Sequence, residues 1–169
     1  MEKLAGAALW LRGAIFTILV PWVVAVWIPG RLSRGVAAPG WWRGGWILVI
    51  AGGLLYLWSL LLFLLSGGTP AIFFLRPVRF LVGSEPDALV RGGPYRFTRN
   101  PMYVAVLAAI FGQAVLHRSV ALLRYGLVFA VIFHAAVALL EEPHLRRSRG
   151  AAYEEYCRRV PRWLGRGKA

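Results

Sequence analysis

The chain has 169 residues, of which 59% are hydrophobic and 14% are aromatic, and it carries a formal net charge of +13. This composition excludes an ordinary soluble domain and predicts an all-α, polytopic membrane protein. The excess of Lys and Arg is typical of residues that orient membrane helices and contact anionic headgroups. We therefore expect the membrane as a partner, no nucleic acid and no metal ion.

Four apolar segments approach the length that a membrane-spanning helix needs, which is roughly 20 residues for about 30 Å of hydrocarbon. In chain order they cover residues 4–28, 46–65, 101–116 and 120–140. The third segment reaches only about 24 Å at 1.5 Å per residue, so it must thin the bilayer locally or extend at one end. We expect about four transmembrane helices followed by a C-terminal amphipathic interfacial helix.

The first segment is too long for the apolar region of a signal peptide, and we expect it to be retained as a helix. With the N-terminus in the cytoplasm, fifteen of the twenty Lys and Arg residues lie on the cytoplasmic side and five on the other. The positive-inside rule then predicts an integral protein of the inner (cytoplasmic) membrane with both termini in the cytoplasm. Nothing in the sequence indicates an oligomeric state.

The chain divides into two unequal parts that together form one integrated membrane domain. Residues 1–66 are expected to form a two-helix scaffold, joined by a loop rich in Gly, Pro and Trp that is typical of an interfacial anchor. Residues 67–169 contain a loop of about 27 residues, a helical hairpin and an amphipathic tail. An unstructured loop of that length usually has a function such as binding, so we expect the chemistry in this second part.

The helix expected at residues 101–116 begins with Asn100 and Pro101, which favour the cap and the first turn of a helix. Such a start leaves backbone amide donors directed toward the preceding loop, where Gly93 permits close approach of a ligand. Tyr103 lies three positions after Asn100 and shares its helical face. A plain helix cap and an interfacial tyrosine are the alternative interpretations.

Two adjacent acids, Glu141 and Glu142, end the last apolar segment and precede a proline. Because proline disfavours helical geometry in the residue before it, we expect a corner near Glu142. The connection at residues 116–119 is so short that the two helices must be antiparallel neighbours, which returns Glu141 to the level of Asn100. Since a desolvated carboxylate needs a partner, the acids together with Arg99 predict a polar site for a small charged ligand. The alternative is a solvated helix end.

Polar side chains also occur deeper in the predicted hairpin. His134 lies two helical turns before Glu141 on the same face, and Gln113 lies in the facing helix, so we expect both to be buried. They are candidates for a functional site or for an interhelical hydrogen bond. Ala108 and Gly112 are expected to permit close packing of helices rather than to bind a ligand.

The tail combines an apolar stripe with a charged face. Tyr153, Tyr156 and Val160 recur at spacings of three and four residues, as on one side of a helix. We expect an interfacial helix that covers the site from the cytoplasm.

About 85 residues at the C-terminal end combine these features in a fixed order and spacing: Leu89-Val90, Gly93-Pro94-Tyr95, Arg99-Asn100-Pro101-Met102-Tyr103, Glu141-Glu142, Leu145, Gly150, Tyr153, Tyr156 and Val160-Pro161. This pattern resembles the isoprenylcysteine carboxyl methyltransferase and phospholipid methyltransferase superfamily, whose members are polytopic membrane enzymes that use S-adenosylmethionine. The resemblance implies a methyltransferase with a lipophilic substrate that enters from the bilayer. It also implies a set of cofactor-binding residues: Asp87, Ala88, Leu89, Val90, Tyr95, Asn100, Pro101, Met102, Tyr103, Glu141 and Glu142.

The chemistry of these residues agrees with what the resemblance implies. S-adenosylmethionine carries a sulfonium, an ammonium, a carboxylate and an apolar adenine. Glu141 is suited to the cationic part, Arg99 and the amides of the following helix to the carboxylate, and Tyr95 or Tyr103 to the adenine. Methyl transfer requires mostly proximity in a dry, oriented site, and Arg99 and His134 are the candidates for positioning the acceptor.

Two positions bear on the acceptor. Carboxyl methyltransferases of this superfamily usually have His at the position of Asn100, and the eukaryotic ones have Arg at the position of Val137. The Asn-Pro-Met-Tyr form is that of phospholipid N-methyltransferases and of many bacterial relatives, so a phospholipid amine is the alternative acceptor. A non-catalytic membrane scaffold is the alternative of another class, and a channel or transporter is disfavoured because the apolar segments carry few charges.

Overall fold

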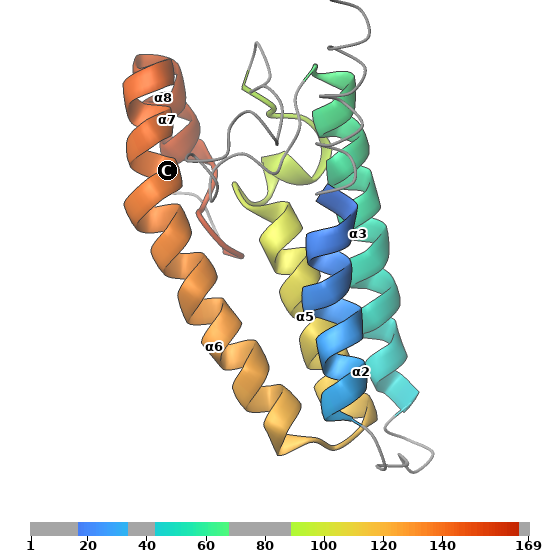
Figure 1. Cartoon of the computed structure of the whole chain (residues 1–169). Helices are drawn as coiled ribbons and strands as arrows, with labels where there is room; N and C mark the ends of the chain where they lie inside the picture. Colours follow the sequence, from blue (N-terminus) through green and yellow to red (C-terminus); the bar gives the residue numbers. More distant parts are fainter. Residues whose placement is uncertain (1–16, 34–42, 68–88, 166–169) are drawn as a thin grey trace, which may run out of the picture.

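The structure, a computed structural model, describes residues 17–33, 43–67 and 89–165. Within these ranges every regular element is a helix, which confirms the predicted all-α class (Figure 1). In chain order the main helices are the N-terminal helix Thr17–Leu32, which includes α2 (Ile28–Leu32), then α3 (Gly45–Leu65), α5 (Pro101–Leu116), α6 (Val120–Ala136), α7 (Glu142–Arg149) and α8 (Ala151–Arg159). Figure 1 shows the long helices side by side, with α7 and α8 at the end where α3 finishes and α5 begins.

Glycines bring the backbones of α3 and α5 close together. A Cβ atom on Gly52 would lie 2.6 Å from the carbonyl oxygen of Ala105 and 3.4 Å from the Cβ of Ala108. A Cβ atom on Gly112 would lie 2.7 Å from the carbonyl oxygen of Gly45. Small residues permit this approach between membrane helices, so Ala108 and Gly112 serve the packing role that the sequence predicts.

The hairpin between α5 and α6 is antiparallel and short, as predicted. After α5 ends at Leu116, Arg118 adopts a left-handed conformation with φ of 47°. The hydroxyl of Ser119 then accepts a hydrogen bond from the amide of Leu122 at 3.2 Å, which caps the start of α6. The first residues of α5 and the last residues of α6 therefore lie at the same end of the bundle.

The N-terminal helix contains a π turn, η1 (Val23–Trp27), shortly before Pro29. Proline has no amide hydrogen to donate to the carbonyl of Ala25, which lies four residues earlier. The amide of Ile28 bonds to the first residue of the π turn rather than to Val24. Two consecutive carbonyls, those of Val24 and Ala25, therefore lack their usual donors within the helix.

Side chains from neighbouring helices donate to these two carbonyls. The amide of Gln113 on α5 donates to the carbonyl of Ala25, and the hydroxyl of Tyr125 on α6 donates to the carbonyl of Val24 at 2.9 Å. At hydrocarbon depth there is no water to replace such donors. The two hydrogen bonds therefore hold the N-terminal helix against α5 and α6, and this gives Gln113 a structural role.

A second π turn, η5 (Val137–Glu141), precedes Pro143 in the same way. The helix that starts at Val120 continues through this proline to Arg149, so the predicted corner near Glu142 is wrong. The wider π turn accommodates the proline ring and the missing amide without ending the helix. The chain reverses instead at Gly150, whose φ of 51° favours glycine.

The apolar stripe of the tail packs inward from α8. Tyr153, Tyr156 and Val160 are buried, and Leu89 and Leu145 pack against them. The predicted stripe is thus confirmed as a packing surface. It joins α7 and α8 to the loop that precedes α5.

Two helices have the length and the apolar composition of a membrane span, namely α3 and the continuous helix Val120–Arg149. Many of their outward side chains are apolar and exposed, as expected for contact with lipid. The N-terminal helix Thr17–Leu32 and α5 are apolar but shorter. Of the four predicted spans, two therefore meet the length and composition of a membrane span among the described residues. The first predicted segment, residues 4–28, lies partly outside the described residues, and its helix runs on to Leu32.

Candidate functional site

The start of α5 and the π turn η5 come into contact at one end of the bundle. The hydroxyl of Tyr103 donates a hydrogen bond to the carboxylate of Glu141, and the guanidinium of Arg99 lies 3.1 Å from the carboxylate of Glu142. Both acids are buried, with exposed fractions of 7% for Glu141 and 1% for Glu142. We call the cluster formed by Arg99, Asn100, Tyr103, Glu141 and Glu142 the candidate site.

Three arginines surround the carboxylate of Glu142. Arg162 donates to both of its oxygens, from Nε at 2.7 Å and from Nη2 at 2.8 Å, and this hydrogen bonding raises the pKa of Arg162. Arg99 and Arg146 lie 3.1 and 3.5 Å from the same carboxylate. These contacts compensate the buried charge of Glu142. Glu141, which accepts from Tyr103, is therefore the acid better placed to meet a cationic ligand.

Residues 161–165 follow α8 and fold back over the start of α5; we call them the C-terminal segment. The carbonyl of Arg162 accepts hydrogen bonds from the side-chain amide of Asn100 at 2.9 Å and from the hydroxyl of Thr98 at 3.1 Å. Asn100 occupies the predicted cap position of α5, but its side chain makes no capping hydrogen bond. The side-chain amide of Asn100 therefore binds the C-terminal segment and does not cap α5.

Trp163 of the C-terminal segment determines the surroundings of His134. Its indole Nε1 donates to Nδ1 of His134 at 3.1 Å, and its ring meets the ring of Tyr103 edge-on, with 6.5 Å between centroids. Because Nδ1 accepts, the proton of a neutral His134 ring lies on Nε2. His134 is exposed, so its predicted burial is wrong: this position of α6 faces outward, and Gln113 is engaged with the N-terminal helix.

The loop before α5 packs on α8. Tyr95 lies in the short 3-10 helix η4 (Gly93–Arg96), and its carbonyl accepts a hydrogen bond from the hydroxyl of Tyr156 at 2.7 Å. Burial raises the pKa of both phenols, so both stay protonated at neutral pH. The remaining residues of the predicted set are placed as follows: Pro101 is buried, Leu89, Val90 and Met102 are half-buried, and Asp87 and Ala88 lie outside the described residues.

Arg99 connects all parts of the candidate site. Its backbone amide donates to the carbonyl of Pro161 at 3.0 Å, and its Nη atoms contact Glu142 and the sulfur of Cys157. Its Nε is the one buried side-chain nitrogen or oxygen without a hydrogen-bond partner among the residues that the structure describes. An unpaired buried donor costs roughly 1–3 kcal/mol, so this nitrogen is a place for an acceptor such as a ligand carboxylate.

The geometry defines an all-helical protein with two candidate membrane spans and a buried polar cluster, which holds both acids and arginines, at one end of its bundle. Residues 44–152 match the model of the phospholipid methyltransferase family. The chain belongs to this family, which confirms the resemblance that the motifs around Asn100 and Glu141 indicate.

Two curated proteins are similar in sequence to part of this chain. Phosphatidylethanolamine N-methyltransferase B of Dictyostelium discoideum is 33% identical over 64 residues, which are 38% of this chain and 32% of that protein. The cobalt-zinc-cadmium resistance protein CzcN of Cupriavidus metallidurans is 31% identical over 88 residues, which are 52% of this chain and 40% of that protein. The matched regions thus span about a third of one relative's length and two fifths of the other's, and no solved structure matches the chain.

Proposed function

We propose that this protein is an integral membrane methyltransferase that uses S-adenosylmethionine and acts on a lipophilic or membrane-embedded acceptor. The observation that carries this proposal is that the candidate site holds groups suited to both charges of a ligand. The buried acid Glu141 ends η5, and Arg99, whose Nε is buried and unpaired, lies directly before the start of α5. Membership in the phospholipid methyltransferase family supports the same activity.

The charged residues of the candidate site complement the charged groups of S-adenosylmethionine. Glu141, oriented by the hydroxyl of Tyr103, would favour the cationic part, and the Nε of Arg99 would donate to the carboxylate. The aromatic rings of Tyr103 and Trp163 offer apolar surface beside these groups. When bound, S-adenosylmethionine supplies a methyl group activated by its sulfonium.

The residues of the site would promote the reaction by orientation and by exclusion of water. Glu142, the first residue of α7, and its arginines fix the start of α5, the start of α7 and the C-terminal segment relative to one another. This rigidity favours a productive arrangement of donor and acceptor, which is the main requirement of a displacement at a methyl group. His134 and Arg99 are the proposed positioning residues for the acceptor.

A phospholipid amine is the acceptor class that the observations favour over a carboxyl group. The matched family and the matched Dictyostelium relative both carry names of phospholipid methyltransferases. Val137, one helical turn before Glu141, is buried and apolar, so this position offers no cation to an acceptor carboxylate. The orientation with both termini in the cytoplasm, which would place the site at the inner leaflet, is part of this proposal.

Calorimetric titration of the purified protein tests the cofactor assignment. We expect micromolar affinity for S-adenosylmethionine, lost in Asn100→Ala and weakened about 10- to 100-fold in Glu141→Gln and Arg99→Lys, as for a lost charge-assisted hydrogen bond. Glu141→Gln should affect S-adenosylhomocysteine less, because that molecule lacks the sulfonium charge. Glu155→Gln, on the exposed face of α8, is the control and should bind like the wild type.

The acceptor is tested separately with radiolabelled S-adenosylmethionine and defined lipids. Transfer of label to phosphatidylethanolamine, and not to a prenylcysteine, would support the phospholipid amine. A wild-type protein that binds neither S-adenosylmethionine nor S-adenosylhomocysteine would contradict the proposal and favour the non-catalytic scaffold. Equal affinity in the wild type and the site variants would reject the proposed residues.

A further inference from the structure

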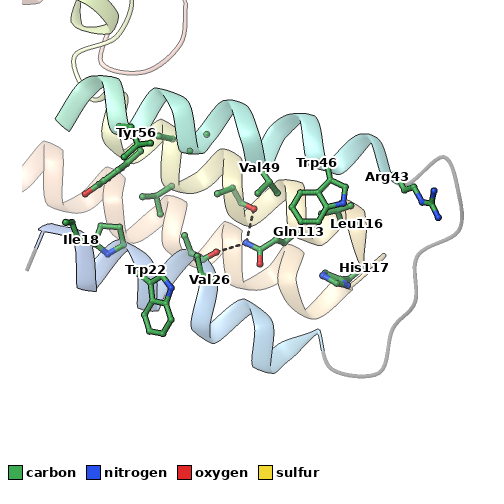
Figure 2. A pocket seen from close by; sticks show the side chains of 18 residues that line it. Ile18, Trp22, Val26, Arg43, Trp46, Val49, Tyr56, Gln113, Leu116 and His117 are labelled. Atoms are coloured by element: carbon green, nitrogen blue, oxygen red, sulfur yellow. Dashed lines mark hydrogen bonds between the residues drawn. The ribbon is translucent and has the colours of Figure 1, made fainter. Parts of the chain in front are cut away.

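A groove lies apart from the candidate site, between the N-terminal helix, α3 and α5 (Figure 2). Its volume is about 680 Å³, within the range of roughly 300–1,000 Å³ that is typical of small-molecule sites. Ile18 and Tyr56 lie at one end of the groove, and Trp46, Arg43 and His117 lie at the other. The first of these ends points toward the candidate site and the second away from it.

The wall between the two ends is apolar. The polar side chains along it are engaged with backbone: Gln113 donates to the carbonyls of Ala25 and Ala109, and Tyr56 donates to the carbonyl of Thr17 at 2.6 Å. The other lining residues between the ends are aliphatic, aromatic or glycine. A strongly polar ligand would therefore find few hydrogen-bond partners along this wall, whereas a hydrocarbon chain would find apolar contacts.

The length of the groove matches one leaflet of a bilayer. From Trp46 to Leu57 the groove follows α3 over 11 residue-to-residue steps, which correspond to about 16 Å of helix at 1.5 Å per step. Half of a hydrocarbon core of about 30 Å is about 15 Å. Since α3 begins at the end remote from the candidate site, this is the leaflet opposite that site.

A positive charge marks the end of the groove that lies away from the candidate site. Of the described residues that line it, Arg43 is the one side chain with a permanent charge, and no acid is present. His117 lies at the same end, and the exposed Trp46 is placed like an interfacial anchor. An anionic headgroup at the membrane surface would complement Arg43, because guanidinium groups bind phosphate well.

We propose that this groove binds an anionic phospholipid of the leaflet opposite the candidate site, with one acyl chain along α3 and the phosphate at Arg43. The lipid would fill the space between the N-terminal helix and the pair α3 and α5. It would be a structural ligand, distinct from the acceptor of the methyl group.

Gly53 allows the groove to be filled without disturbing the helix contacts. It lines the groove, and a Cβ atom placed on it meets nothing within 4 Å. Gly53→Leu would therefore occupy the path of the acyl chain. Gly30→Leu is the matched control, because Gly30 also has open space around its Cβ but does not line the groove. Arg31, exposed and stacked on Trp27 outside the groove, provides Arg31→Gln as the control for Arg43→Gln.

Native mass spectrometry of the full chain, titrated with phosphatidylglycerol or phosphatidylcholine, tests the proposal. We expect one tightly bound phosphatidylglycerol, about tenfold weaker binding in Arg43→Gln and loss of binding in Gly53→Leu, while both controls bind like the wild type. Equal binding of the two lipids, undiminished binding in Gly53→Leu, or an equal loss in Arg31→Gln would overturn it. Binding of S-adenosylhomocysteine, measured in parallel, should be the same in all these variants and reports on the proposed methyltransferase site independently.

Discussion

The hydroxyl of Tyr103 donates a hydrogen bond to the carboxylate of Glu141, although the two residues lie 38 positions apart in the chain. The contact joins the first turn of α5 to the π turn η5, and it aligns the acid that we assign to the cationic part of the cofactor. Tyr103→Phe would keep the ring and remove the donor. We expect Tyr103→Phe to lower the affinity for S-adenosylmethionine about 3- to 10-fold, the effect of roughly 1 kcal/mol for one hydrogen bond.

The measurement is a titration of Tyr103→Phe beside Tyr103→Ala. The ring contacts of Tyr103 with Phe133 and Trp163, at centroid distances of 4.8 and 6.5 Å, should persist in the first variant and vanish in the second. Tyr103→Ala should therefore lose both affinity and thermal stability. If Tyr103→Phe bound the cofactor as the wild type does, the orientation of Glu141 by this hydroxyl would be irrelevant.

The buried acid Glu142 should contribute strongly to stability. Glu142→Gln would leave the guanidinium groups of Arg99 and Arg162 without their carboxylate, and breaking a buried ion pair typically costs about 3–5 kcal/mol. The side chain of Arg146 is 46% exposed and lies 3.5 Å from the carboxylate of Glu142. Arg146→Gln should therefore lower the free energy of unfolding by less than about 1 kcal/mol. Thermal unfolding in detergent compares the two variants, and similar losses in both would contradict the central role of Glu142.

The contact between α3 and α5 predicts opposite effects at two adjacent glycines. Gly52→Ala places a methyl group 2.6 Å from the carbonyl oxygen of Ala105, so the helices must separate, and we expect a loss of about 1–3 kcal/mol. Gly53→Ala points into open space and improves helix propensity, so it should be neutral or stabilising by up to about 1 kcal/mol. Unfolding midpoints of the two single variants test this contrast, which would fail if both lost stability equally.

The side-chain amide of Gln113 is expected to replace the backbone N–H that Pro29 lacks. Gln113→Ala should destabilise the protein by about 1–2 kcal/mol, because the carbonyl of Ala25 loses its hydrogen bond at hydrocarbon depth. In the Pro29→Ala background a backbone amide becomes available, so the same substitution should cost less. A double-mutant cycle of these two positions measures the coupling, and strictly additive losses would disprove the replacement.

The hydroxyl of Tyr156 should stabilise the packing of α8 on the loop before α5. Tyr156→Phe leaves the buried carbonyl of Tyr95 without its donor, so we expect a loss of about 1–3 kcal/mol. Because burial raises the pKa of Tyr156 above its ordinary value of 10, the stabilisation is complete below pH 10 and is lost as the pH rises toward the folded-state value. The unfolding midpoint of the wild type should fall more steeply above pH 10 than that of Tyr156→Phe.

The fold was largely predictable because its signals are local. Runs of apolar residues between Ser, Pro and Gly place α3, α5 and α6, and the short connection before Ser119 forces the hairpin that brings Glu141 to Tyr103. The π turn at Glu141 was not predictable, since proline after a helix more often starts a new one than widens the old one.

The part of the site formed by the C-terminal segment could not be predicted for another reason. Arg162 and Trp163 meet Glu142 and His134 because the chain reverses twice, at Gly150 and after α8. Neither contact has a periodic signal, and the sequence offers only a basic and an aromatic residue directly after Val160-Pro161.

Main-chain atoms fix how the C-terminal segment docks. The oxygen that receives the amide of Asn100 and the hydroxyl of Thr98 belongs to the peptide group of residue 162, and the amide of Arg99 reaches the peptide oxygen of residue 161. Every amino acid provides such oxygens, so these contacts depend on the spacing of the C-terminal segment from Tyr156, whereas the contacts with Glu142 and His134 need the side chains of Arg162 and Trp163. A single insertion or deletion between Tyr156 and residue 161 would therefore put the wrong peptide groups opposite Asn100, even with Arg162 and Trp163 kept.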